Sequence, residues 1–309
     1  MSKLITYTPL QQVQPVNQSM HLTIMQEVGS YLQHVNDTKS GSTLKTYTAN
    51  INAFIDWLLV QDTNMLLKWH LEAYRYHLNS KFNSSRSKNL AISTVRSLFK
   101  WLHDEGMIDH NPALTLDNFK VNNERHAKSG LNKYQLHDLM QYTKTLKVRD
   151  RVLMSLLLSN GVRANEVSNI LIEDVSQRGE NMVIYLLRKG YDDKSEFTIL
   201  NEETYARVKE LIGDRSKGYL FVSQKGGGMA TTTLSRLVKK IFRAVGIDDS
   251  SLTMHSCRHT AAILALKSGA NIMQVSQMLG HKHLSSTNVY LKSMDREDNP
   301  AEKMFSIYD

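Results

Sequence analysis

Six side chains in the second half of the chain have the chemical types that cleavage of a phosphodiester needs. Planar guanidinium groups match the non-bridging oxygens of a phosphate and neutralise charge in the transition state. A lysine ammonium can protonate a departing 5′-oxygen, and histidines can accept the proton of a tyrosine and hold the phosphate. A phenol, with a pKa of about 10, is a poor nucleophile without such help. The six residues, which together require no metal ion or other cofactor, are Arg163, Lys189, His255, Arg258, His281 and Tyr290.

The first arginine and the lysine each have an ordinary alternative. In SNGVRANEVSNI, Arg163 follows a glycine turn and Glu166 stands one helical turn later. Glu166 is therefore placed to hold the guanidinium or to cap the start of a helix, although a merely structural arginine is the common case. Lys189 in LLRKGYDDK is expected at the tip of a hairpin, where lysines are usually solvated. Lys194 offers a second lysine in the same turn.

The segment LTMHSCRHTAA supplies a histidine and an arginine three residues apart. This spacing puts His255 and Arg258 on one face of a helix. A metal site is the alternative, because His255 and His259 are spaced i, i+4 and His281 and His283 follow. No carboxylate accompanies them as in H-E-x-x-H, and Arg258 would stand beside the cation. We therefore expect no metal.

The segment LGHKHLSSTNVYLK, residues 279–292, ends the set with a tyrosine nine positions after His281. Together with the residues before it, 271–290 resembles a helix-turn-helix: a short apolar helix, a glycine turn and a polar helix. That pattern alone would indicate a non-catalytic DNA-binding regulator. It gives no reason for Arg163, Lys189 and the H-x-x-R motif to occur in order, so we expect LSSTNVYL to form a helix that presents Tyr290.

The elements expected around these residues are mainly helical. Asn132 can cap a helix in KYQLHDLMQYTKTL, and RDRVLMSLLLSNG predicts another that stops at Gly161. Residues 182–199 change character, since VIYLL and EFTIL read as strands around a turn and predict a β-hairpin. Helical patterns return over the ranges 203–212, 231–244, 255–268 and 272–279.

The first half predicts a compact bundle of four or five helices. In STLKTYTANINAFIDWLL, Ser42 is a plausible N-cap, and the expected apolar face consists of Leu44, Tyr47, Ile51, Phe54, Ile55 and Leu58. In SKNLAISTVRSLFKWLHDEG, the helix stops at Gly106 and its expected apolar face consists of Leu90, Val95, Leu98, Phe99 and Leu102. The polar stretch that follows is typical of a linker.

The amino-acid composition and net charge limit the kinds of protein that this chain can be. The 309 residues carry a formal net charge of +8, which indicates a polyanionic partner such as nucleic acid. Only 15 glycines and 4 prolines are present, which favours a mostly helical fold. The single cysteine, Cys257, excludes an intramolecular disulfide and is expected to be a packing residue. The longest apolar runs are far short of a membrane span, so we expect a soluble, cytoplasmic protein.

With these motifs in order, the chain resembles the tyrosine site-specific recombinases, or phage-type integrases. The resemblance rests on GVRANE, RKG, HSCRHT and LGH followed by Tyr290. It implies a mainly α fold with a small β-hairpin or sheet (α+β), in two domains that clamp duplex DNA. It also implies that Tyr290 forms a 3′-phosphotyrosyl link while Arg163 and Arg258 bind the phosphate, Lys189 is the general acid, and His255 and His281 assist. Neither ATP nor metal is required, and strand exchange passes through a Holliday junction.

The resemblance also implies a domain plan. A flexible arm (1–20) precedes a helical, SAM-like core-binding domain (21–115), a linker (116–131), the catalytic domain (132–292) and a tail (293–309). The tail, with Met304, Phe305, Ile307 and Tyr308, would dock on a neighbouring protomer of a homo-tetramer on double-stranded DNA with inverted-repeat core sites. Packing of the tail against its own domain is the alternative. Type IB topoisomerases share the residue types, but the apolar tail and the L-G-H spacing favour a recombinase.

Nine further cations are expected to contact DNA, mostly at phosphates, where they set affinity and its salt dependence. A solvated surface charge is the alternative for each of them. They are Lys45, Lys81, Arg86, Lys88, Arg96, Lys100, Arg236, Lys239 and Lys240.

Overall fold

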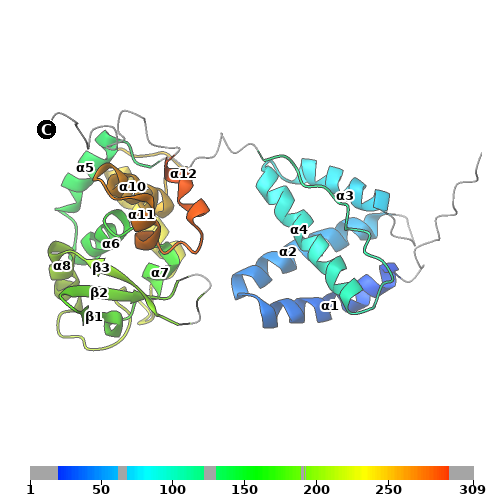
Figure 1. The fold of residues 1–309 in the computed structure, drawn as a ribbon, viewed down its shortest axis with the longest axis horizontal. Coiled ribbons are helices and arrows are strands. Elements are labelled where there is room, and N and C mark those ends of the chain that lie inside the picture. Colours follow the sequence, from blue (N-terminus) through cyan, green and yellow to red (C-terminus); the bar gives the residue numbers. More distant parts are fainter. Residues whose placement is uncertain (1–19, 62–67, 122–129, 189–190, 192, 292–309) are drawn as a thin grey trace, which may run out of the picture. The chain divides into compact units, whose positions relative to one another are not determined.

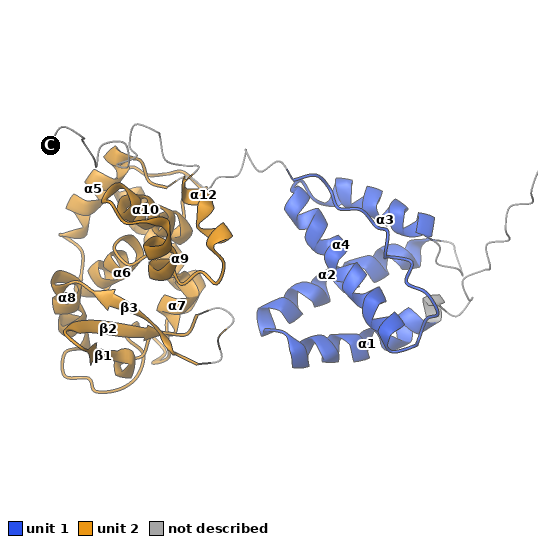
Figure 2. Cartoon of the chain, in the orientation of Figure 1, with its two compact units in different colours: residues 1–123 blue, residues 124–309 orange. Residues whose placement is uncertain are grey.

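A computed structural model describes residues 20–61, 68–121, 130–188, 191 and 193–291 of the chain (Figure 1). The chain divides into two compact units, residues 1–123 and 124–309 (Figure 2). The fold class is confirmed: helices dominate, and the described strands form one small antiparallel sheet. None of the helices in the described ranges is long and apolar enough to cross a lipid bilayer.

The first unit is built from helices packed around one apolar core. They are α1 (Met20–Thr38), α2 (Gly41–Val60), α3 (Lys68–Lys81) and α4 (Ser85–Asp104). Phe54 stands at the centre, with its ring edge-on to Tyr74 at 4.9 Å and to Phe99 at 6.1 Å between centroids. Burial of large aromatic side chains of this kind contributes most of a small domain's hydrophobic stabilisation.

Two details of the predicted helices are wrong. Ser40, not Ser42, caps α2, because Ser40 has extended backbone angles and its hydroxyl accepts from the Thr43 N–H, whereas Ser42 already lies inside the helix. Leu90 is exposed, because the buried face of α4 passes through Ala91, Ile92 and Val95, and Leu90 lies off it. The α4 C-terminus agrees with prediction, since Gly106 adopts a positive φ of 69° just after the helix.

The segment expected to be a linker, 116–131, is held at both of its described ends. Leu116 is buried in the first unit, and the side chain of Asn89 both accepts from the Phe119 N–H and donates to the Phe119 carbonyl. At the other end, the Leu131 N–H donates to the Thr260 hydroxyl at 2.8 Å in the second unit. The described residues at the two ends of this segment therefore pack with the unit to which each belongs.

The second unit places a central helix against the sheet and surrounds it with further helices (Figure 1). The central helix, α6 (Val148–Leu158), buries residues on most of its circumference. Around it are α5 (Lys133–Thr143), α7 (Ala164–Ser168), α8 (Glu202–Ile212), α9 (Thr231–Ala244), α10 (Met254–Lys267), α11 (Ile272–Leu279) and α12 (Asn288–Leu291), with short 3-10 turns at Ile172–Asp174 and Leu284–Ser286. Asn132 caps α5 with a reciprocal capping box, as expected.

The sheet contains the predicted hairpin and one strand that was not predicted. Strands β2 (Asn181–Leu186) and β3 (Glu196–Leu200) are antiparallel, with Val183 opposite Ile199. Strand β1 (Val175–Arg178) adds to the other edge of β2. Its sequence, VSQR, is four residues long and has no apolar alternation, so it carries no strand signal of its own.

Candidate active site

Arg163 is fixed at the start of α7 by a buried carboxylate. Gly161 ends the preceding turn with a φ of 62°, and a Cβ there would come within 2.7 Å of the Leu279 side chain. Glu166 is 2% exposed; its two oxygens accept from the Arg163 backbone N–H at 2.9 Å and from Arg163 Nη1 at 2.6 Å. Both roles predicted for Glu166, holding the guanidinium and capping the helix, are confirmed.

Arg258 is a buried arginine on α10. Thr253 caps this helix, and Arg258, one turn further on, is 1% exposed. Its Nη1 donates to the Gly161 carbonyl and its Nη2 to the Leu279 carbonyl, each at 2.6 Å. Burial, reinforced by the positive charge of Arg163, lowers the pKa of Arg258 to about 10. The guanidinium remains charged at neutral pH in a place where charge is costly, which favours binding of an anion.

A second buried arginine, Arg188, follows the end of β2. It is 2% exposed, and its Nη2 donates to the carbonyls of Phe197 at 3.3 Å and of Met278 at 3.4 Å. In the sequence, Arg188 stands out only as the residue before Lys189 in the RKG motif. The alternation of the strand could have found it, because Ile184, Leu186 and Arg188 occupy the same face and all three are buried.

The three arginines meet at the C-terminus of α11. Arg188 donates to the carbonyl of Met278, Arg258 to that of Leu279, and Arg163 to that of Gly280 at 3.4 Å. These carbonyls form the negative end of the helix dipole, so the end of α11 partly offsets three positive charges. Glu166 is the one fully buried carboxylate among the described residues near them, which leaves the cluster with excess positive charge.

His281 and Tyr290 complete this group. Gly280 ends α11 in the left-handed conformation, and His281 follows with its Nδ1 2.7 Å from the Thr287 hydroxyl. Burial, and then the charges of the three arginines, lower the pKa of His281 to about 4, so its imidazole is neutral at physiological pH. Tyr290 is 3% exposed; its ring stacks on His281 with centroids 6.2 Å apart and meets the edge of His259 at 4.9 Å.

The single helix expected over LSSTNVYL is wrong. The structure has a 3-10 turn at Leu284–Ser286 and then the four described residues of α12. Thr287 and Tyr290 are buried here, because the segment packs back onto α10 and α11. A DNA-reading helix needs a free face at these positions, so the helix-turn-helix interpretation does not fit the described residues.

Of the remaining candidate residues, one is exposed, one is held by neighbours and one lies outside the described residues. His255 is exposed in the first turn of α10, three residues before Arg258. Lys189 lies outside the described residues, as does the expected tail. Lys194 is engaged: its Nζ lies 2.5 Å from an oxygen of Asp174 and donates to the Asn169 carbonyl at 2.9 Å. Burial raises the pKa of Cys257 to about 12, in keeping with a packing residue.

Other sequence predictions concern metals and DNA-contacting cations. In the described part of the chain, no three His, Cys, Asp or Glu side chains come together as a metal site would require. Five of the nine cations are exposed and have no charged partner among the described residues: Lys45, Lys81, Arg86, Arg236 and Lys240. The other four are tied to neighbours: Lys88 to Asn79, Arg96 to Asn118, Lys100 to Asp104 and Lys239 to the Ser250 carbonyl.

Comparison with known proteins identifies the group to which this site belongs. Residues 130–297 match the Phage integrase family, and residues 24–109 match its N-terminal SAM-like domain. A tyrosine recombinase of Pseudothermotoga lettingae is 30% identical over 281 residues, which cover 89% of this chain and 95% of that protein. The chain belongs to the phage integrase family of tyrosine recombinases. It is an enzyme of site-specific DNA recombination, and neither the topoisomerase nor the regulator alternative is favoured.

Further relatives agree with this assignment. The recombinase is 26% identical to XerD of Proteus mirabilis over 265 residues, covering 81% of this chain and 82% of that one. Its fold is that of the XerH recombinase bound to palindromic difH substrate, with a TM-score of 0.72 at 18% identity, covering 96% and 98% of the two chains. The lambda integrase tetramer bound to a Holliday junction gives 0.67 at 17% identity, covering 86% and 76%.

Proposed function

We propose that this recombinase cleaves and rejoins DNA through a covalent link between Tyr290 and a 3′-phosphate. The Tyr290 oxygen attacks the scissile phosphorus, the bond to the 5′-oxygen breaks, and the phenolic proton passes to a neighbouring base. Lys189 gives a proton to the departing 5′-oxygen. Because the phosphodiester energy is retained in the phosphotyrosyl link, religation to a partner strand needs no ATP.

The observation that carries this proposal is the convergence of Arg163, Arg188 and Arg258 around a single fully buried carboxylate, beside Tyr290. A buried excess of guanidinium charge is stabilised by an anion of matching shape, and a phosphodiester offers two non-bridging oxygens. In this scheme Arg163 and Arg258 neutralise the charge that develops on the phosphate in the transition state.

The histidines have distinct parts in this scheme. His281 is neutral because burial and the arginine charges lower its pKa; a bound phosphate offsets those charges, raises the basicity of the imidazole and so suits it to accept the Tyr290 proton when DNA binds. His255 lies on the exposed start of α10 and is suited to hold a phosphate oxygen from the solvent side. The exposed cations of both units contact the backbone of duplex DNA on each side of the scissile bond.

The experiment that tests cleavage by Tyr290 first requires the DNA site that the protein recognises. Genomic fragments retained by the Tyr290→Phe variant supply the cognate duplex, which is then nicked near the scissile phosphate so that cleavage becomes irreversible. We expect the wild type to form a covalent protein–DNA adduct, Tyr290→Phe to form none, and the control Tyr308→Phe to behave as the wild type. An adduct that survives in Tyr290→Phe contradicts the proposal.

The proposed assembly is a homo-tetramer on inverted-repeat core sites, in which two rounds of exchange pass through a Holliday junction. Each tail, residues 293–309, docks on the catalytic unit of the next protomer in a cyclic arrangement. The reaction takes place on nucleoid DNA in the cytoplasm of a prokaryotic cell.

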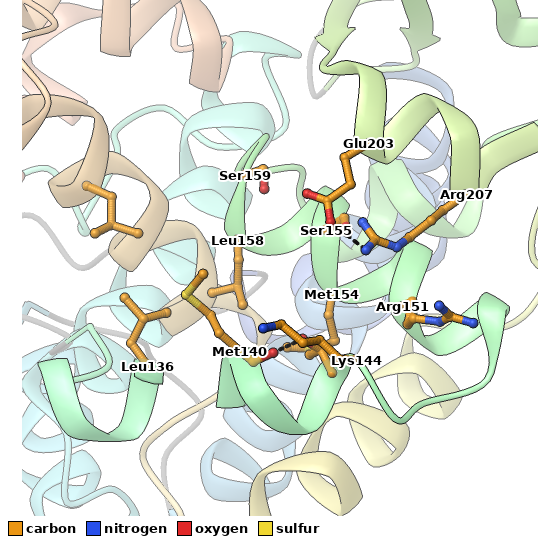
Figure 3. Close-up of a pocket in the computed structure, with 12 residues that line it drawn as sticks. Leu136, Met140, Lys144, Arg151, Met154, Ser155, Leu158, Ser159, Glu203 and Arg207 are labelled. Carbon is orange, nitrogen blue, oxygen red and sulfur yellow. Dashed lines mark hydrogen bonds and ion pairs between the residues drawn. The ribbon is translucent and has the colours of Figure 1, made fainter. Parts of the chain in front are cut away.

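A pocket on the second unit is suited to receive this tail (Figure 3). It has a volume of about 200 Å³ and lies between α5, α6, α8 and α10, away from the arginine cluster. This is smaller than the roughly 300–1,000 Å³ of small-molecule sites, and fits one large apolar side chain such as Phe305. Figure 3 shows Leu136, Met140 and Leu158 at one end of the pocket and Arg207 with Glu203 at the other.

Two matched variants test the assembly. Met140 is 54% exposed at the pocket, so Met140→Asp is expected to leave DNA binding intact while preventing tetramer formation, as is Phe305→Asp in the tail. Met273→Asp, at a 69% exposed methionine outside the pocket, is the control. Sedimentation of the protein on core-site duplex distinguishes dimer from tetramer, and a Met140→Asp protein that still forms tetramers contradicts this docking site.

A further inference from the structure

Arg188 is a buried cation, and the catalytic roles proposed above give it no part. Removing its guanidinium from water costs free energy, which these roles do not explain. Burial lowers its pKa, and its nearest carboxylate, Glu196, stands 3.9 Å from Nε and is 40% exposed. Within the described structure, its Nε has no hydrogen-bond partner. An apolar residue at position 188 would avoid this desolvation cost, so the presence of an arginine there calls for a role in the site.

The contacts of Arg188 join two separate parts of the second unit. Its Nη2 lies between the Phe197 carbonyl on β3 and the Met278 carbonyl in the last turn of α11. The hairpin that continues from Arg188 therefore shares a donor with the helix that ends just before His281.

Gly280 shows how closely the two parts fit. Its φ of 61° favours glycine, and a Cβ at this position would overlap the guanidinium of Arg188. The backbone that turns from α11 into His281 therefore rests directly on Arg188. Any change in the length or position of that side chain is transmitted to the residue that carries the imidazole.

We propose that Arg188 is a positioning residue, which fixes the end of α11 against the β2–β3 hairpin and so aligns His281 with Arg163 and Arg258 around the scissile phosphate. This inference rests on the proposed function. Arg188 itself acts through the backbone of residues 278–281.

The test compares Arg188→Met with Arg178→Met, which removes an exposed arginine from β1 of the same sheet. Both are assayed with the nicked duplex at saturating DNA, where the rate constant of adduct formation is separated from its amplitude. Because misplacement of a catalytic group by about 1 Å can cost roughly 100-fold in rate, we expect a loss between tenfold and 100-fold for Arg188→Met and none for Arg178→Met. A merely structural role lowers the amplitude and leaves the rate constant unchanged.

A rate constant in Arg188→Met equal to that of Arg178→Met overturns the inference. If Arg188→Met does not fold by circular dichroism, Arg188→Lys is used in the same comparison: a lower rate constant supports the inference and a wild-type one overturns it. Failure of the proposed function looks different, because the wild type itself would then form no Tyr290-dependent adduct.

A double-mutant cycle tests the contact itself. Gly280→Ala introduces the overlapping Cβ, and truncation of Arg188 to Met removes the group it meets. We expect Gly280→Ala to slow adduct formation by a smaller factor in the Arg188→Met background than in the wild type. Equal factors in the two backgrounds would mean that the residues act independently and would overturn the proposed coupling.

Discussion

Arg258 and Gly161, which lie 97 residues apart in the chain, are joined by a hydrogen bond of 2.6 Å from Nη1 to the carbonyl oxygen. This bond ties the glycine turn that precedes Arg163 to the helix that carries His255. Arg163 and Arg258, the two arginines expected to bind one phosphate, therefore have their relative position set by backbone as well as by side chains.

Gly161 should be more sensitive to substitution than a glycine of similar conformation elsewhere. Gly161 and Gly179 have φ values of 62° and 60°, so Ala at either pays the cost of a left-handed residue, about 1 kcal/mol. Only at Gly161 does the new Cβ also meet a neighbour, the Leu279 side chain. We expect Gly161→Ala to lose about 1–3 kcal/mol more of the free energy of unfolding than Gly179→Ala, measured with urea. Equal losses of unfolding free energy in the two variants would mean that the Leu279 side chain moves aside without destabilising the core, and would contradict this prediction.

Removal of Glu166 should expose the charge imbalance of the cluster. Without this carboxylate the three arginines keep little compensation; breaking a fully buried ion pair from one side costs about 3–5 kcal/mol, and because Arg163 is partly exposed we take the lower end, about 3 kcal/mol. We expect Glu166→Ala to show this loss in urea unfolding, and sulfate to restore stability more in this variant than in the wild type. The control is Asp248→Ala, which breaks an exposed pair with Arg243. A Glu166→Ala protein as stable as this control would contradict the imbalance.

His281 should make the protein less stable in acid. Its folded pKa is about 4 and its unfolded pKa the ordinary 6.5, so between these values the unfolded chain binds a proton that the folded chain does not. Stability contributed by the neutral imidazole is present above pH 6.5 and is lost as the pH falls toward 4. We expect the wild type to lose on the order of 2 kcal/mol more than His281→Asn across this range. Parallel pH profiles for the two proteins would refute the shift.

Sequence patterns predicted most of the helices because their apolar periods match their buried faces, as in α9 and α11. They also brought Arg163, Arg258, His281 and Tyr290 into one candidate site, which the fold places together. The alternation of Ile184 and Leu186 could have indicated that Arg188 is buried, but its contact with the carbonyl of Met278, a residue 90 positions later, has no local signal. The break in LSSTNVYL was missed for a similar reason: Thr287 is buried where the segment packs on α10 and α11 and its hydroxyl pairs with His281, and no local pattern encodes these contacts.

Substitution of the two hairpin lysines should have different effects: one should lower folding stability and the other should stop adduct formation. Lys194 is bound to Asp174 and the Asn169 carbonyl, so Lys194→Ala is expected to cost about 1 kcal/mol of folding free energy while adduct formation continues. Lys189→Ala is expected to abolish adduct formation on a normal duplex, because the 5′-oxygen then leaves without a proton.

A duplex with sulfur in place of the bridging 5′-oxygen distinguishes the two lysines directly. A thiolate has a much lower basicity than an alkoxide and departs without protonation. This substrate should therefore restore adduct formation in Lys189→Ala and leave Tyr290→Phe inactive, because the attacking group is still absent there. If it rescued Lys194→Ala instead, after that variant had failed on the normal duplex, the general acid would be Lys194, and the ion pair with Asp174 would have to open when DNA binds.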